Sequence, residues 1–323
     1  MQALQDLLKS KLHGRTSPKG WFSFNCPMCV MNGQSRPDTK FRGGVIYAPD
    51  GGVSYHCFNC QFKTSWQPGW TLGFKMKKLM RQLGFDEAEI QRLNLELLSQ
   101  ADVEQLKSKE PEVSWTPNWP DFTFDFDVDV ASNDQILDYL QSRNLQNRAV
   151  WLQSGSSMHN MSKRVILPYT YQNRLVGYVA RWLGTPPEGK PKYFRRSPAD
   201  YVYGLDAQQE GRQFVIVTEG EFDALQVNGV AIMSNMISDR QVQLIEDLNI
   251  EPVVVPDRDR AGKKMAERAA DLGWSVSFPE WDDCKDINDA VNKYGRLITL
   301  HRILNSIEQS PTKIRLLSRR LSV

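Results

Sequence analysis

The stretch VVVPDRDRAGKK, residues 253–264, decides the fold. Three consecutive valines are typical of a strand that is buried on both faces, as in a parallel sheet. Asp257 and Asp259 follow the valines directly, and a helical pattern begins after them. A buried strand that ends in two carboxylates predicts a site at the carboxyl end of a sheet, because open α/β sheets bind ligands there.

Strand and helix patterns alternate on both sides of this stretch. Residues 214–220, 230–234 and 274–281 are predicted strands, and residues 221–229, 238–249 and 260–273 are predicted helices. This alternation predicts a doubly wound, mostly parallel α/β sheet. Upstream, residues 132–144 form a helical pattern, and residues 164–182 predict a hairpin that turns at Gln172 and Asn173. The whole is a mixed α/β fold.

Acidic side chains follow three of the predicted strands. EGEFDA places Glu219 at the end of one strand with Asp223 one helical turn later, and DDCKDINDA places Asp286 after the last strand. Clustered carboxylates repel one another unless cations lie between them, and oxygen ligands favour Mg²⁺ or Mn²⁺. We therefore predict a catalytic site for two or more divalent ions, with these ligands: Glu219, Asp257, Asp259 and Asp286. Taken alone, an Asp-x-Asp pair before a helix is equally a capping and turn pattern.

Four of the five cysteines form two close pairs, in CPMC (26–29) and HCFNC (56–60). Two such pairs predict one structural zinc ion bound by four thiolates: Cys26, Cys29, Cys57 and Cys60. Between the pairs, residues 41–56 alternate around the turn Asp50-Gly51-Gly52, as expected for the hairpin of a zinc ribbon. The surrounding aromatic residues are either the core of this small domain or a stacking surface for bases.

Length and composition predict several soluble domains. The chain has 323 residues, a net charge of +2, 24% charged residues and 41% apolar residues, which neither demands nor excludes a nucleic-acid partner. Neither a membrane-spanning run nor a signal peptide is evident, so we expect a cytoplasmic location and no membrane partner. We expect a zinc ribbon at 1–66, a helical segment and acidic, proline-rich linker at 67–130, a basic subdomain at 131–210, the doubly wound unit at 211–295 and a basic tail at 296–323.

The acidic motifs EG-x-x-DA, D-x-D-x-AG and KD-x-ND resemble the TOPRIM domain of primases, topoisomerases and related nucleases. Upstream, KRVILPYTYQNRLVGYVAR and KPKYFRRSPADYVYGLD resemble the basic segments of DnaG-type bacterial primases. The order of zinc ribbon, linker, basic subdomain and TOPRIM extends this resemblance over nearly the whole chain. The chain most resembles the stand-alone primases of T-even-type bacteriophages. No G-x-x-x-x-G-K-[ST] motif, the mark of a fused helicase, follows.

The resemblance implies a DNA primase, a nucleotidyltransferase of the DNA-directed RNA polymerase class that makes short RNA primers during DNA replication. It implies catalytic roles for Glu219, Asp257, Asp259 and Lys192, with Asp223 and Asp286 at accessory acidic positions. It implies contacts to nucleotide or template from these cations: Arg164, Arg181, Lys192 and Arg195. The implied partners are a single-stranded DNA template, ribonucleoside triphosphates, a replicative helicase acting in trans and a single-stranded-DNA-binding protein.

Two other functions remain open. One is a TOPRIM nuclease or topoisomerase, and the other is a non-polymerising recombination mediator that joins a zinc site to TOPRIM. The basic C-terminal tail, with Lys313, Arg315, Arg319 and Arg320, predicts either a helicase or DNA contact or a solvated helix.

Overall fold

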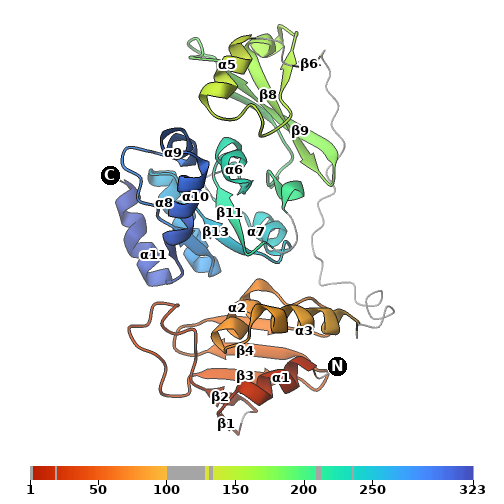
Figure 1. Ribbon diagram of the computed structural model, residues 1–323, viewed down its shortest axis with the longest axis vertical. Coiled ribbons are helices and arrows are strands. Elements are labelled where there is room, and N and C mark those ends of the chain that lie inside the picture. The colour runs from red at the N-terminus through yellow and green to blue at the C-terminus, as the bar shows by residue number, and fades with distance from the viewer. Residues whose placement is uncertain are drawn as a thin grey trace.

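The computed structural model describes residues 3–18, 20–99, 128–130, 134–208, 212–234 and 236–322. The described residues form three five-stranded sheets with their helices, and these stack along the long axis of the molecule (Figure 1). Most of the predicted linker lies outside the described residues. Among the described helices, none has the length and apolar character needed to cross a membrane.

The first sheet is the predicted zinc ribbon. Its antiparallel strands lie in chain order: β1 Arg15–Thr16, β2 Phe22–Phe24, β3 Gly43–Tyr47, β4 Val53–Cys57 and β5 Lys63–Trp66. The predicted hairpin is β3–β4, where the Gly52 N–H donates to Asp50 Oδ1 at 2.9 Å. Helices α1 Ala3–Lys11, α2 Phe74–Gln82 and α3 Glu87–Ser99 share its apolar core, and Gly84 separates α2 from α3 at φ +86°.

The second sheet carries the predicted basic subdomain. Its order is β10 Tyr193–Arg196, β9 Arg174–Trp182, β8 Arg164–Tyr171, β7 Leu152–Ser154 and β6 Val128–Val130, all antiparallel. Helix α5 Asp134–Ser142 and the 3-10 turn Met158–Lys163 complete the unit. The predicted hairpin is β8–β9, with Gln172 and Asn173 at φ +51° and +60°. Because β6 pairs with β7, the last three residues of the predicted linker are part of this sheet.

The third sheet confirms the predicted doubly wound fold. Strands β12 Val230–Ala231, β11 Phe214–Thr218, β13 Glu251–Val254 and β14 Ser275–Ser277 are parallel, and β15 Ile307–Glu308 adds an antiparallel edge. Its helices are α6 Glu221–Val227, α7 Asp239–Glu246, α8 Arg260–Leu272, α9 Ile287–Tyr294, α10 Arg296–Asn305 and α11 Pro311–Ser318. Val254 packs in the cluster with α7 and α8, whereas Val255 packs with α9 and α10, so helices cover both faces.

The predicted basic tail, residues 296–323, packs against this third unit through the residues that the structure describes. Strand β15 pairs with β14, and helix α11 packs on α8. Ile303 and Ile314 are fully buried, and the Ser310 hydroxyl caps α11 by accepting from the Lys313 N–H. A two-residue strand gives no alternation pattern, and for this reason the sequence did not reveal it.

Helix α2 joins the zinc ribbon to the third sheet at the amino-terminal ends of its parallel strands. Lys78 Nζ lies 3.2 Å from Glu251 Oε1 at the first residue of β13, and both side chains are nearly buried. Lys75 Nζ donates to the Leu272 carbonyl at 3.0 Å. The zinc ribbon therefore lies at the end of the sheet opposite to the carboxyl ends of its strands (Figure 1).

Candidate functional site

The four paired cysteines meet in one cluster, with all four sulfur atoms within 4.8 Å of one another. The Sγ atoms of Cys26 and Cys60 are 3.9 Å apart, and those of Cys29 and Cys57 are 3.7 Å apart. A tetrahedral zinc ion with Zn–S bonds of about 2.3 Å places its sulfurs about 3.8 Å apart. The cluster fits a structural zinc ion, with all four ligands supplied by the protein.

Hydrogen-bond donors surround these sulfurs. The Tyr55 hydroxyl donates to Cys26 Sγ at 2.8 Å, and Asn59 Nδ2 lies 3.3 Å from Cys29 Sγ. Hydrogen bonding to Cys57 and Cys60, followed by burial, raises the pKa of Cys26, whereas the contact with Cys26 lowers the pKa of Cys57. Because the four thiols are in contact, the ionisation of one disfavours the ionisation of the others. A divalent cation bound among them would stabilise all four thiolates.

Acidic side chains converge at the carboxyl ends of the third sheet, at the far end from the zinc ribbon. Glu219 follows β11, Asp257 follows β13, and Asp286 begins α9. The charges of Asp257 and Asp259 act on the pKa of Glu219, so acids that follow separate strands lie close together. The Asn288 N–H donates to Asp223 Oδ1 at 2.8 Å, which brings α6 and α9 together behind them.

The carboxylates repel one another strongly. Burial, with Asp257 and Asp259 next in effect, raises the pKa of Glu219 to about 7. Burial and then Asp286 raise the pKa of Asp257 to about 7. Glu219 Oε1 is also buried without a hydrogen-bond partner among the described residues. A buried carboxylate oxygen without a partner, facing other acids, fits a site that takes a cation.

Asp259 and Asp286 act as helix caps, and for Asp259 this is the other interpretation of the Asp-x-Asp pattern. Asp259 accepts from the N–H groups of Ala261 and Gly262 at the start of α8, and its second oxygen lies 3.2 Å from Lys285 Nζ. Burial opposes the change, but the Gly262 N–H and Lys285 lower the pKa of Asp259. Asp286 caps α9 by accepting from the Asp289 N–H.

The acids surround a wider space than the cysteines do. Within the described residues, the cysteine cluster is the one group of three or more possible ligands whose atoms all lie within 4.8 Å. Magnesium usually keeps several waters and takes only a few carboxylates. The spacing suits a hydrated ion held by Glu219 and Asp257 better than a closed cage of four carboxylates.

Lys192, next to strand β10, lies close to Asp286, whose charge acts on the pKa of Lys192, and Arg181 lies close to Lys192. Arg181 is 5% exposed, and its guanidinium lies 4.4 Å from the Tyr139 ring centroid and 5.8 Å from that of Phe222. Burial, followed by the nearby charges of Arg181 and Arg143, lowers the pKa of Lys192. The aromatic rings fix the Arg181 guanidinium in place, and so its charge is preorganised for an anion.

Two of the predicted nucleotide or template contacts are occupied within the protein. Arg195 Nη2 lies 2.9 Å and 3.0 Å from the two carboxylate oxygens of Glu221, which is buried on α6. Arg164 is 1% exposed and donates to backbone carbonyls of three residues: Pro191, Lys192 and Ala180. Arg195 therefore ties β10 to α6, and Arg164 positions the segment that carries Lys192. Their contacts to nucleotide or template stay predictions.

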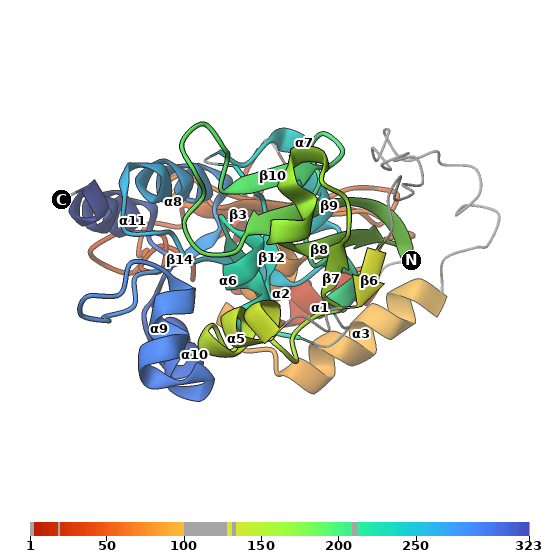
Figure 2. The ribbon, with the colours of Figure 1, turned by 90° about the horizontal axis from the view of Figure 1, so that it is seen from above.

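Arg143 is a site residue that the sequence did not reveal. It follows α5, and its Nη1 donates to Asn288 Oδ1 at 2.6 Å. Figure 2 shows α5 beside α9, and Asn144 Nδ2 also donates to Asn292 Oδ1 at 3.0 Å. A single arginine at the end of a helix carries no spacing signal, so only the fold shows that it reaches the acids.

Comparison with known proteins identifies one domain. Residues 216–291 match the Toprim-like family. No curated protein sequence matches the chain. The chain contains a Toprim-like domain that spans the strands and helices bearing Glu219, Asp257 and Asp286.

Several solved structures are similar to parts of this chain. A DnaG catalytic core is 22% identical with a TM-score of 0.44, over 59% of this chain and 77% of that one. A DnaG primase catalytic domain bound to single-stranded DNA is 20% identical with a TM-score of 0.45, over 57% and 76%. The zinc-binding and RNA polymerase domains of the Aquifex aeolicus primase are 18% identical with a TM-score of 0.39, over 95% and 83%.

Proposed function

We propose that this chain is a DNA primase that joins ribonucleotides into short RNA primers on single-stranded DNA. The observation that carries the proposal is the meeting of Glu219 and Asp257, both with pKa values raised to about 7, with the cations Lys192 and Arg143 close to the neighbouring Asp286. Carboxylates for divalent ions and fixed cations for phosphates are the two requirements of nucleotidyl transfer.

Each side chain has a distinct role in this proposal. Bound divalent ions, Mg²⁺ or Mn²⁺, would supply charge neutralisation on the phosphates and a lower pKa for the attacking hydroxyl. Arg181, Lys192 and Arg143 would hold the triphosphate of the incoming nucleotide by charge-assisted hydrogen bonds. Glu219 would hold an ion beside the attacking 3′-hydroxyl, where the charge of the ion lowers the pKa of that hydroxyl.

The zinc ribbon would select the template in this proposal. Phe58 is 57% exposed, and the rings of Trp21 and His56 lie 5.4 Å and 4.6 Å from its centroid. Exposed rings of this kind stack on unpaired bases. A replicative helicase in trans and a single-stranded-DNA-binding protein are the further proposed partners.

Primer synthesis from labelled ribonucleotides on a single-stranded template tests the proposal. The wild-type protein should make short RNA only with Mg²⁺ or Mn²⁺, and Asp257→Asn should lose at least about 100-fold in rate while keeping its far-UV circular dichroism. Asp239→Asn is the matched control, because this aspartate is 93% exposed and pairs with Arg268 on the surface.

Three results would reject the proposal. If the Asp257→Asn variant made primers at the wild-type rate, the acids would not take part in the reaction. Nicking or relaxation of DNA without RNA products would favour a nuclease or topoisomerase. Tight DNA binding without turnover would favour a recombination mediator.

A further inference from the structure

A groove runs from the catalytic acids around the start of helix α8. One cavity of about 510 Å³ is lined by Arg258, Asp259 and the first turns of α8. A second, of about 910 Å³, is lined by the segment after β14, by α10 and by the end of α11. Arg258 and Leu321 line both cavities, so the two form one surface, here called the α8–α11 groove.

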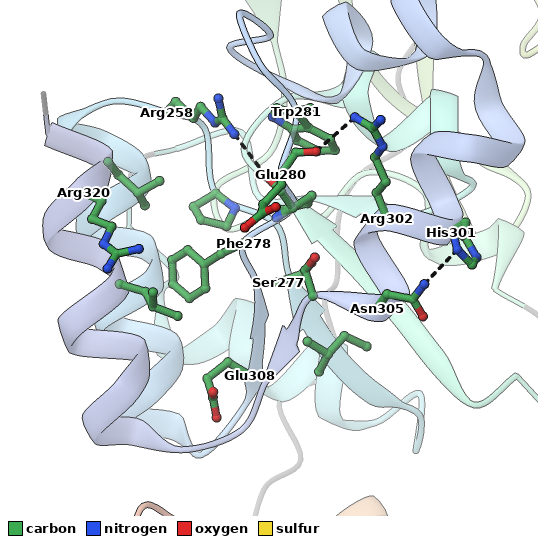
Figure 3. Close-up of a pocket in the computed structure, with 16 residues that line it drawn as sticks. Arg258, Ser277, Phe278, Glu280, Trp281, His301, Arg302, Asn305, Glu308 and Arg320 are labelled. Atoms are coloured by element: carbon green, nitrogen blue, oxygen red, sulfur yellow. Dashed lines mark hydrogen bonds between the residues drawn. The ribbon is translucent and has the colours of Figure 1, made fainter.

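The groove opens between helices α10 and α11. Figure 3 shows Arg320 on one side, Arg302 on the other, and Phe278 and Ser277 between them. Arg258 lies in the wall of the groove, and its guanidinium donates hydrogen bonds to the carbonyl oxygens of Asp282 and Pro279 at 2.6 Å and 3.1 Å. The residue between the two catalytic aspartates thus points away from the acids and into this second surface.

Cations in the groove lack carboxylate partners. Within the described ranges, no ion pair is found for five cations of the groove: Arg258, Arg260, Lys263, Lys264 and Arg320. Four acids line the groove as well: Asp259 is paired with Lys285 and Glu308 with Lys313, while Glu267 and Glu280 have no ion pair among the described residues. Six lysine and arginine side chains line the groove, so its cations outnumber its acids.

Cations on the same helices that lie outside the groove are paired. Arg268 on α8 pairs with Asp239, and Arg315 on α11 pairs with Asp271. Lys313 at the start of α11 pairs with Glu308 at 3.5 Å. On α8 the paired cation is the one outside the groove, and the cations at the start of α8 lie along the groove without carboxylate partners. Arg320, in the turn that follows α11, adds a further charge to the same surface. Gathered, unpaired cations attract a polyanion.

We propose that the α8–α11 groove binds the phosphodiester backbone of single-stranded DNA next to the catalytic acids. The proposal rests on the proposed primase function, which supplies a strand at Asp257 and Asp259. Because Asp259 itself lines the groove, the groove begins at the acids, and a strand bound there would extend the nucleic-acid contact along α8.

Salt-dependent DNA binding tests the groove. Fluorescence anisotropy with a labelled single-stranded oligonucleotide should give a linear fall of log K with log salt concentration. Each lost phosphate contact lowers that slope by about 0.7, so the triple variant Arg260→Ala, Lys263→Ala, Lys264→Ala should lower it by about 2. The matched control is Arg268→Ala, Lys313→Ala, Arg315→Ala, which removes the same charge from paired sites and should leave the slope unchanged.

The outcomes distinguish a groove that binds DNA from one that does not. A groove variant with the wild-type slope, or a control that lowers the slope as much, would overturn the proposal. Loss of binding to polyglutamate with unchanged DNA binding would also overturn it, and would assign the groove to an acidic protein. Zinc content and circular dichroism confirm that both variants are folded.

A second assay distinguishes a failure of the groove proposal from a failure of the proposed primase function. On a template only a few nucleotides long, the groove variant should form the first dinucleotide within about twofold of the wild-type rate, because three surface charges act on template affinity and not on the acids. If the wild-type protein forms no dinucleotide at all, the proposed function fails. If dinucleotides form normally and the salt slope does not change, only the groove proposal fails.

Discussion

Divalent-ion affinity should rise steeply with pH between about 6 and 8. The perturbation is the protonation of Glu219 and Asp257, whose pKa values are each raised to about 7. A carboxyl group with that pKa is about a tenth ionised at pH 6 and about nine-tenths ionised at pH 8. Because an ion must displace these protons, each group changes the affinity about tenfold over this range.

Both groups together would give at most about a 100-fold change, and the partial exposure of Glu219 and Asp257 to solvent reduces it. The stability of the metal-free fold depends on pH in the opposite direction to the ion affinity. Since both folded pKa values lie above the ordinary values of 4.5 and 3.8, the metal-free fold gains stability from these groups as the pH falls below 7. It loses that stability as the pH rises through 7, and added Mg²⁺ should restore it there.

Isothermal titration calorimetry with Mn²⁺, in buffers of different ionisation enthalpy, measures both the affinity and the protons released. We expect about one to two protons released for each protein near pH 6.5 and almost none above pH 8. The variant Asp257→Asn should release about one proton fewer and show a weaker dependence on pH. An affinity that is equal at pH 6 and pH 8, with no proton release, would refute the inference that these acids hold the ion.

Three further predictions concern stability and geometry. Cys57→Ser should lose bound zinc, measured by elemental analysis, and melt the zinc ribbon; zinc retained at wild-type levels would contradict the four-thiolate site. Lys78→Met should lower the free energy of unfolding in urea by about 3 kcal/mol, because Glu251 stays buried without its cation, and adding Glu251→Gln should recover most of the loss. Gly262→Ala should weaken Mn²⁺ binding at least about tenfold, since a Cβ there would lie 2.1 Å from the Asp257 carbonyl oxygen and displace that residue; unchanged affinity would show that the loop tolerates the shift.

Features encoded by local pattern were predictable from the sequence. The valines of β13, the hairpin turn at Gln172 and the cysteine pairs each have a short-range signal, and the structure has all three. The carboxyl ends of neighbouring parallel strands must meet at one edge, so the sequence also predicted that Glu219 lies close to Asp257.

Features that depend on long-range packing were not predictable in the same way. Arg195 looks like a free cation in the sequence, but the buried Glu221 that pairs with it is 26 residues away in the chain. Ion pairs of this kind form only after the two sheets come together. Arg143 reaches Asn288 across 145 residues for the same reason. The tail, too, shows no strand pattern until β14 provides an edge to pair with.

The most direct test of the central claim is the position of a bound divalent ion. Crystals soaked with Mn²⁺ should show an anomalous peak at bonding distance from both the Glu219 and Asp257 carboxylates, and this peak should vanish in Asp257→Asn. Manganese found only elsewhere, with Glu219 and Asp257 making no contact to it, would contradict the claim.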